Sequence, residues 1–340
     1  MKLKEFQAFM QEESIDLALL SNSTEKINPN FVYFIQNDHI NSILILKKDP
    51  GLFVSPIELS IAKENSKIKN IQKFDKTFYE KLKELKPNTI GIDRDFVTLN
   101  QFKNLKSKFK KIKFKDISEQ IKKLRLIKTE EEINLIKKAC YFADILMREA
   151  VANAKIAKTE LDLKKIIEKK ILDLNLNPSF DPIVASSKNS KNPHHISNNT
   201  KLKGFTVIDL GVKYKNYCSD ITRTVFIGKP NKKQIEIYNK VLEVQENSIN
   251  NNLQPKQMHE YAQKTLGKSF NHSLGHGIGI EVHETPIISS FSTDAFKNNM
   301  VFTIEPGYYN DFGIRIEDVF MYKNNKKIQL TNSPKTLLII

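Results

Sequence analysis

Two acidic residues lie inside apolar, β-branched segments, where aspartate is uncommon. Asp209 belongs to the segment FTVIDL, and Asp220 belongs to YCSDITRTVFI. If the segments form an antiparallel hairpin that turns at Tyr214 and Lys215, residues whose numbers sum to 429 face each other, so Asp209 faces Asp220. Opposed side chains have Cβ atoms about 4.5–5.5 Å apart, and two carboxylates that close repel each other. A bound cation removes this repulsion, and such oxygen ligands suit Mn, Mg, Ca, Fe or Co. The alternative is a pair of acids exposed on the surface.

A second segment of the same character lies nearer the C-terminus. VFTIEPGYYNDFGIRIED carries Glu305 and Glu317 on either side of a turn near Asp311, and a regular ladder places them opposite each other. Asp209 and Glu305 are 96 residues apart, and Asp220 and Glu317 are 97 apart. These offsets indicate an internal duplication, with coincidence as the alternative. Four carboxylates in one cleft need more than one divalent ion, and two metals that share carboxylates would satisfy them.

Histidines concentrate in the same part of the chain, with six of seven between residues 194 and 283. His276 lies between Gly275 and Gly277, where the backbone can approach closely, and imidazole is the commonest nitrogen ligand for these metals. The segments NPHH and HSLGHGIGIEVHE contain most of the others: His194, His195, His272 and His283. Taken singly, each histidine is more simply a structural or surface residue, and His39 and His259 are interpreted in that way.

The sequence predicts two domains, and these candidate site side chains belong to the second. The first part of the chain alternates short apolar runs with helical patterns, which predicts an α/β domain. Its predicted strands are 16–21, 31–35, 42–48, 52–56 and 89–95, and its predicted helices are 59–66 and 78–85.

The second part begins with a helix start signal, because Thr129 and Glu132 form a capping box. Apolar residues then recur every three or four positions along one helix face, and Cys140 lies on that face as a core residue. Further helices are predicted at 159–175, 231–250 and 254–266, and strands at 180–187, 205–210, 217–227, 300–305 and 313–321.

Composition limits the classes of function. The 340 residues carry a net charge of +15, but no nucleic-acid-binding motif accompanies it, so the charge is interpreted as scattered lysine rather than a nucleic-acid surface. Two cysteines without a paired framework favour a reducing compartment. Neither a secretory signal nor an apolar run long enough for a membrane span is evident, so we expect a cytoplasmic protein with no membrane or nucleic-acid partner.

Five segments together resemble a known family. They are IKTEEEINLIKKA, FDPIVASSKNSKNPHH, VIDLGVKYKNYCSDITRTVFIG, GHGIGIEVHETP and IEPGYYNDFGIRIED. Their order and spacing resemble the proline-specific branch of the methionine-aminopeptidase-like metallopeptidases, which contains Xaa-Pro aminopeptidase and Xaa-Pro dipeptidase (prolidase). The resemblance implies an α/β plus α+β chain, with a creatinase-like α/β domain at residues 1–122. A pita-bread catalytic domain with an internal pseudo-twofold repeat is then expected at residues 123–340.

The resemblance also implies the residues of a dinuclear metal site. Asp220 and Glu317 are expected to bridge two divalent ions, His276 and Glu305 to complete the shell of one ion, and Asp209 to chelate the other. The ions are expected to be Mn, with Co, Zn or Fe as alternatives, because supply as well as ligand type decides the metal. A hydroxide that bridges them would attack the carbonyl before proline, and Glu305 would relay the proton.

Three more residues are expected to meet the substrate, a peptide with proline at its second position. His194 and His283 match the two non-ligand histidines of the family and are expected in catalysis and substrate binding. Arg315 matches an arginine beside the last glutamate of the family and is expected to bind substrate, since on a strand it shares the face of Glu317. A homodimer is expected from the same resemblance.

The chain departs from the family pattern at two positions, and both are expected to affect the entrance for substrate. Ser187 occupies a position where the family usually has glycine, and Lys191 one where a small residue is common. Two other functions stay open from the sequence: a non-catalytic binding protein that uses its basic surface, and a relative that hydrolyses a non-peptide amidino substrate.

Overall fold

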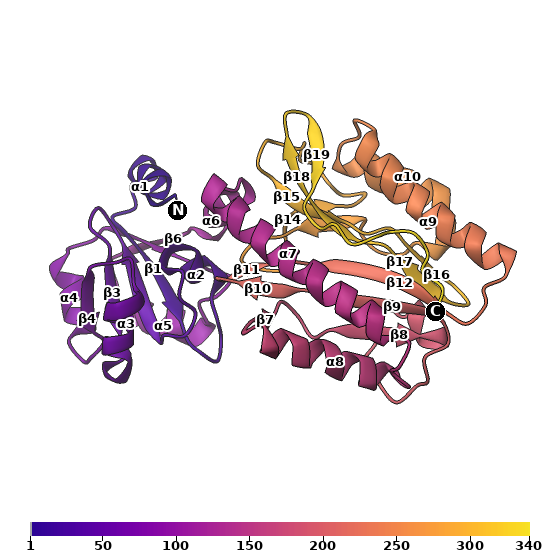
Figure 1. Ribbon diagram of the computed structural model, residues 1–340. Helices are drawn as coiled ribbons and strands as arrows, with labels where there is room; N and C mark the ends of the chain where they lie inside the picture. The colour runs from indigo at the N-terminus through magenta and orange to yellow at the C-terminus, as the bar shows by residue number, and fades with distance from the viewer. Residues whose placement is uncertain (1) are drawn as a thin grey trace. The chain divides into compact units, whose positions relative to one another are not determined.

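The computed structural model describes residues 2–340, and the chain divides into two compact units, Met1–Arg125 and Leu126–Ile340 (Figure 1). Each unit has its own sheets and helices. The sequence-based boundary between residues 122 and 123 stays a prediction. Within the described chain, no helix is long and apolar enough to cross a membrane.

The first unit is built on a mixed sheet. In the described residues its strand order is β4-β3-β2-β1-β5-β6, where β1–β2 and β2–β3 pair antiparallel and the other neighbours pair parallel. The strands are β1 Leu17–Asn22, β2 Ser42–Leu46, β3 Gly51–Val54, β4 Asn70–Lys73, β5 Thr89–Ile92 and β6 Lys113–Asp116. The helices are α1 Leu3–Glu12, α2 Pro29–Ile35, α3 Leu59–Asn65, α4 Phe78–Glu84, α5 Leu99–Lys108 and α6 Ser118–Leu126, with a 3₁₀ turn η1 at Pro56–Glu58.

The strand predicted at residues 31–35 is wrong, because this segment belongs to helix α2. Asn28 caps the helix by accepting hydrogen bonds from the backbone amides of Asn30 and Phe31, and Pro29 occupies its first turn. Every residue of α2 is buried, so its apolar run has no polar face to reveal the helical period.

The second unit pairs two helices with each of two sheets (Figure 1). Its helices are α7 Glu130–Asn153, α8 Glu160–Asp173, α9 Lys232–Asn250 and α10 Pro255–Leu266. One sheet has the order β12-β9-β8, from β8 Ile183–Ser186, β9 Gly204–Leu210 and β12 Ile221–Ile227. The other has the order β14-β13-β15-β18-β19, from β13 Gly275–Gly277, β14 Glu284–Ile288, β15 Val301–Ile304, β18 Asp318–Lys323 and β19 Lys326–Gln329.

Shorter elements form two further small sheets, one of three strands and one of two. They are β7 Asn177–Pro178, β10 Val212–Tyr214, β11 Tyr217–Cys218, β16 Gly307–Tyr309 and β17 Gly313–Arg315, with 3₁₀ turns η2 Ser187–Lys191 and η3 Gly267–Ser269.

Apolar helix faces hold each layer of the second unit together. Residues of α7 and α8, such as Met147 and Ile167, pack with Ile208 of β9 in one core cluster. Residues of α9 and α10, such as Val241, pack with Phe302 of β15 in another. The predicted capping box at the start of α7 is present, and the predicted helix face, including Cys140, is buried. The same order of helix pair and hairpin therefore occurs twice, as the duplication predicted.

The register of the first hairpin differs from the prediction. Asp209 pairs with Thr222 and not with Asp220. The turn lies one residue later than predicted, at Lys215 and Asn216, whose φ angles of 47° and 67° are those of a tight two-residue turn with both central residues left-handed. Asp220 precedes Thr222 by two positions and is therefore diagonal to Asp209 on the same side of the ladder. The two carboxylates still share one face.

The second hairpin has the predicted register on both sides of a break. Gly307 pairs with Arg315 in one ladder, and Ile304 pairs with Asp318 in the other. Between the ladders the backbone turns to other partners: the Glu305 amide donates to Leu274 O at 2.8 Å, and the Glu317 amide donates to Thr222 O at 3.1 Å. This second bond joins the two hairpins at the acidic residues.

Candidate metal centre and catalytic cleft

A cleft of about 910 Å³ in the second unit is lined by all the site residues predicted from the sequence. They are Asp209, Asp220, His276, Glu305 and Glu317, together with His194, His283 and Arg315. The acids come from the first hairpin and from the break in the second, and His276 comes from the short strand β13. Residues spread over more than 120 positions of the chain therefore meet in one place.

The centre of the cleft has the geometry of a metal site. Asp220, His276 and Glu317 are buried and each offers a ligand atom, and these atoms all lie within 4.8 Å of one another. The Nε2 atom of His276 lies 3.6 Å from Asp220 Oδ2 and 3.4 Å from Glu305 Oε1. Its Nδ1 atom donates to Gly277 O at 3.0 Å, which fixes the tautomer and leaves the Nε2 lone pair directed at the carboxylates.

Crowding of like charges shifts the pKa values of these groups. Burial, and then the neighbouring carboxylates, raise the pKa of Asp220 and Glu317 well above the usual range. Burial raises the pKa of Glu305 to about 7 and lowers that of His276 to about 4. With four carboxylates ionised, one Arg315 charge and a neutral imidazole, the formal charge of the site is −4 + 1 = −3. The arrangement favours bound cations.

Unsatisfied atoms indicate where cations fit. Asp209 Oδ1 and Asp220 Oδ1 are buried and have no hydrogen-bond partner among the described residues. A buried polar atom without a partner is costly unless a ligand completes it. Hard oxygens with one imidazole are suitable ligands for divalent Mn, Fe, Co or Zn. The residues present therefore fit a site for divalent metal ions.

All three nitrogen atoms of the Arg315 guanidinium group donate hydrogen bonds within the site. One terminal nitrogen donates to Asp209 Oδ2 at 2.5 Å, the other donates to the Tyr309 hydroxyl at 3.1 Å, and Nε donates to the Thr222 hydroxyl at 3.1 Å. The Thr222 hydroxyl in turn donates to Glu317 Oε2 at 2.7 Å. Arg315 thus orients the carboxylate of Asp209, and Thr222 orients that of Glu317.

Sequence reasoning missed Thr222 and the hydrogen-bonding role of Tyr309. Thr222 follows Asp220 by two positions, so strand periodicity could have placed it on the same face. Tyr309 hydroxyl donates to His272 Nε2 at 3.2 Å, and His272 Nδ1 donates to Ser273 O at 2.7 Å. Burial, and then the charge of Arg315, lower the pKa of His272 to about 4, which keeps its imidazole neutral as an acceptor.

The two non-ligand histidines reach the cleft from different loops. His283 follows the glycine-rich segment of β13, and its ring centroid lies 4.3 Å from that of His276 in an edge-to-face arrangement. His194 lies in the loop after η2 and is exposed to the cleft. Phe180, Ile183 and Ile196 add apolar surface to the cleft wall.

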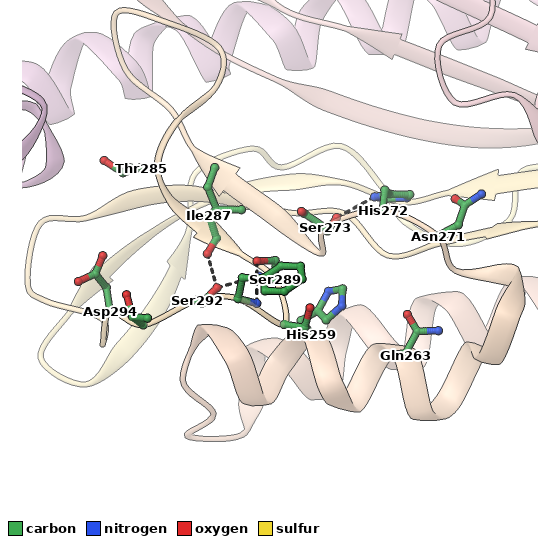
Figure 2. A pocket seen from close by; sticks show the side chains of 13 residues that line it. His259, Gln263, Asn271, His272, Ser273, Thr285, Ile287, Ser289, Ser292 and Asp294 are labelled. Carbon is green, nitrogen blue, oxygen red and sulfur yellow. Dashed lines mark hydrogen bonds between the residues drawn. The ribbon is translucent and has the colours of Figure 1, made fainter. Parts of the chain in front are cut away.

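A second cavity of about 720 Å³ adjoins this cleft and shares part of its wall (Figure 2). Asn271, His272, Ser273 and Ile287 line both spaces. Figure 2 shows His259 and Gln263 on helix α10 along one side, and Ser289, Ser292 and Asp294 on the loop opposite. Its lining is rich in hydroxyl groups and includes no lysine or arginine among the described residues.

The two departures from the family pattern lie in η2. Ser187 has a φ of 57°, in the left-handed region where glycine is preferred, which explains why glycine suits this position. Lys191 is exposed at the end of the same turn.

Comparison with known proteins assigns the two parts of the chain to families. Residues 2–127 match the creatinase/prolidase N-terminal domain, and residues 134–324 match metallopeptidase family M24. The chain is 35% identical to Xaa-Pro dipeptidase of Pyrococcus horikoshii, with 99% of this chain and 98% of that protein covered. It is 36% identical to Xaa-Pro dipeptidase of Pyrococcus furiosus, with 99% of each covered.

Solved structures give the same result. X-Pro aminopeptidase from Thermotoga maritima has a TM-score of 0.92 at 30% identity, with 100% of both chains covered. Prolidase from Pyrococcus horikoshii has a TM-score of 0.89 at 34% identity, with 99% of both covered. These matches confirm the expected creatinase-like domain and pita-bread catalytic fold. The chain therefore belongs to metallopeptidase family M24 and is a metallopeptidase that carries a creatinase/prolidase N-terminal domain.

Proposed function

We propose that this metallopeptidase hydrolyses Xaa-Pro bonds, at the N-terminus of peptides or in dipeptides, with two divalent ions held by Asp209, Asp220, His276, Glu305 and Glu317. The observation that supports it most is the convergence of these five side chains, four of them carboxylates, in one cleft. The names of similar proteins, Xaa-Pro dipeptidase and X-Pro aminopeptidase, support the proline specificity.

Metal ions bound in this site would polarise the scissile carbonyl as Lewis acids and would lower the pKa of the attacking water. Glu305 accepts the proton of that water and delivers it to the leaving nitrogen. It is placed for this exchange because it lines the cleft at the edge of the acidic cluster, with its Oε1 atom 3.4 Å from His276 Nε2.

His194 and His283 act on the substrate. Both rings line the cleft without being part of the acidic cluster, so each can donate a hydrogen bond to the developing oxyanion or to the leaving nitrogen. Arg315 contributes by holding Asp209 and Thr222 in place, and the predicted direct contact of Arg315 with substrate stays a proposal.

Proline is selected because its imide nitrogen carries no hydrogen and its ring is rigid. A site that made a hydrogen bond to the substrate N–H would reject proline, whereas an apolar wall accepts the ring. Phe180, Ile183 and Ile196 provide such a wall at the cleft.

The test is turnover by the purified protein loaded with Mn, Co, Zn or Fe, on Ala-Pro and on Ala-Pro-Ala. We expect hydrolysis with Mn and none after exhaustive chelation. Absence of turnover with every metal on both substrates would refute the proposal. The ratio of the two rates distinguishes a dipeptidase from an aminopeptidase, and Ala-Ala serves as the control for proline specificity.

Asp220→Ala and Glu317→Ala should each abolish turnover and lower bound metal, because both carboxylates belong to the cluster that the ions require. A variant that keeps its activity would contradict the ligand assignment. The alternatives predict otherwise: a non-catalytic binding protein would hold no metal and bind nucleic acid in a salt-dependent way, and an amidino-substrate relative would not need the intact ligand set.

The homodimer, the cytoplasmic location and the absence of a nucleic-acid partner stay predictions of the sequence. Sedimentation of the purified protein tests the dimer directly, and a monomer at micromolar concentration would contradict it.

A further inference from the structure

A buried carboxylate outside the metal cluster organises one wall of the catalytic cleft. Glu160 is the first residue of α8 and is 0% exposed. The N-cap of the helix is already provided by Thr159, whose side chain forms a capping box with Asp162. Glu160 is therefore not needed to cap its own helix, and a polar group so deeply buried requires another set of hydrogen-bond partners.

Those partners all come from a single segment of the chain. Glu160 Oε1 accepts from the Ser186 amide at 2.7 Å and from Asn189 Nδ2 at 3.0 Å. Glu160 Oε2 accepts from His195 Nε2 at 2.7 Å and from the Asn198 amide at 3.1 Å. Four donors spaced along thirteen residues thus converge on one carboxylate, and they hold this segment, 186–198, around the start of α8.

The segment 186–198 presents His194 to the cleft. His195 is largely buried, with a side-chain exposure of 10%, whereas His194 beside it is exposed. Within residues 2–340 the His194 ring has no hydrogen-bond partner in the protein. Its position therefore depends on the backbone of its own segment, and the nearest fixed point of that backbone is the His195–Glu160 pair.

We propose that Glu160 is a positioning residue for the proposed peptidase reaction, and that it acts through His195 to hold His194 in place over the substrate. This inference rests on the proposed function only for the role of His194. Holding the segment itself is a property of the fold and can be tested without turnover.

Glutamine at position 160 separates charge from shape. One end of its amide can still accept two hydrogen bonds, but the other end carries an NH₂ group that faces donors. Glu160→Gln therefore keeps the side-chain volume and turns two acceptor contacts into donor–donor contacts. Mutation of residues that orient metal ligands through hydrogen bonds typically lowers activity by about 10–100-fold, and we expect an effect of similar size here.

A double-mutant cycle with His194→Ala tests the proposal. Glu160→Gln should lower kcat/KM on Ala-Pro by about 10–100-fold with bound metal unchanged. In the His194→Ala background the same change should alter kcat/KM less than about twofold, because the group it positions is gone. An equal loss in both backgrounds, or a His194→Ala variant as active as the wild type, would overturn the proposal.

Two further variants provide a second test and a control. His195→Asn removes the Glu160 partner at the cleft side and should give the same non-additivity if Glu160→Gln does not fold. Glu168→Gln is the matched control, because Glu168 lies on the same helix with a half-exposed side chain that is ion-paired with Lys164 at 3.8 Å. It should leave kcat, KM and metal content unchanged.

Limited trypsin digestion gives a readout that does not need catalysis. Lys188 and Lys191 are exposed in the segment that Glu160 holds. Cleavage after them should be at least about tenfold faster in Glu160→Gln and His195→Asn than in the wild type or Glu168→Gln. If no Xaa-Pro peptide is hydrolysed, the proposed function fails, yet faster cleavage still supports the anchoring role. Unchanged cleavage overturns it.

Discussion

At the scale of single residues, the acidic cluster is a place where stability and activity oppose each other. The pKa of Asp220 is raised by burial and then by Glu317, Asp209 and Glu305, so in the metal-free protein its ionised form is unfavourable. Cations convert this repulsion into attraction, and the same residues then bind metal.

Asp220→Asn should therefore stabilise the metal-free protein while it abolishes metal-dependent turnover. We expect a gain of at least about 1 kcal/mol at pH 8 in the presence of a chelator, or about 2–4 °C in Tm, because one buried charge is removed. Thermal unfolding by circular dichroism measures it. A metal-free variant less stable than the wild type would contradict the electrostatic account.

The pH dependence provides the control. A carboxyl whose folded pKa is raised, as for Glu305 at about 7, is protonated in both states at low pH and favours the unfolded state as pH rises. Metal-free wild type should thus lose stability between about pH 4.5 and pH 7, since unfolded glutamate ionises near 4.3. The Asp220→Asn profile should be flatter over the same range.

Sequence reasoning found the acids and histidines of the site because chemistry restricts them to few residue types. It could not find Glu160, because a glutamate in the first turn of a helix is usually exposed to solvent. Only the fold shows that the segment 186–198 closes over it. Thr222 was within reach of strand periodicity, but a threonine in a β-strand is too common to stand out.

At the scale of elements, the turn that carries His283 is fixed by a buried ion pair. Lys128 Nζ lies 3.0 Å from Glu284 Oε2, and the two side chains are 1% and 5% exposed. The Glu281 amide donates to Glu284 Oε1 at 3.1 Å, which closes the turn before β14. The start of α7 thus supports the cleft, much as the start of α8 does through Glu160.

Lys128→Met should destabilise the protein by about 3–5 kcal/mol, because it leaves a carboxylate buried without its cation. The double variant with Glu284→Gln should recover a large part of that loss, since the uncompensated charge is removed. Urea unfolding of the two variants measures both values. Equal stability of the single and double variants would show that the pair does not act as a unit.

Backbone strain in η2 gives a prediction of the opposite sign. Ser187 has a φ of 57°, and a non-glycine residue there costs about 1–2 kcal/mol, against about 0.5–1 kcal/mol of chain entropy for glycine. Ser187→Gly should therefore stabilise the protein by up to about 1 kcal/mol in urea unfolding. Lys188 does not have a left-handed backbone, so Lys188→Gly should destabilise the protein. Changes in unfolding free energy of the same sign for the two variants would contradict the account of strain at Ser187.

Helices and strands were predictable where their apolar residues recur at helical or strand spacing. The long helix α7 shows a capping box and an apolar face, and both are present in the structure. Helix α2 was assigned to a strand because all its residues are buried. The strands β4 and β6 are largely polar and exposed or half-buried, so they lack the apolar alternation by which strands are found. The hairpin register failed by two residues because turn position depends on which residues accept a left-handed backbone.

At the scale of the whole molecule, all five candidate ligands belong to the unit Leu126–Ile340. Binding of metal to the folded state alone stabilises it by about 2.7 kcal/mol at a metal concentration one hundred times Kd. We therefore expect chelation to lower the unfolding temperature of this unit and added Mn to restore it. Calorimetry with and without Mn measures the effect, and identical transitions would contradict a metal-linked fold.

Charge illustrates what composition can and cannot tell. The chain has a net charge of +15, yet the candidate metal site combines four carboxylates with a single arginine. An overall count would have suggested an anionic partner, whereas the positions of a few acids indicate cations. Family membership follows from the order of those few residues along the chain and was within reach of the sequence.

Anomalous diffraction from crystals grown with Mn tests most directly whether this cleft holds a pair of ions. We predict two anomalous peaks in the cleft, both in contact with Asp220 and Glu317, one also with Asp209 and the other also with His276 and Glu305. A cleft with no peak, or ions held by other side chains, would contradict the assignment on which the proposed reaction depends.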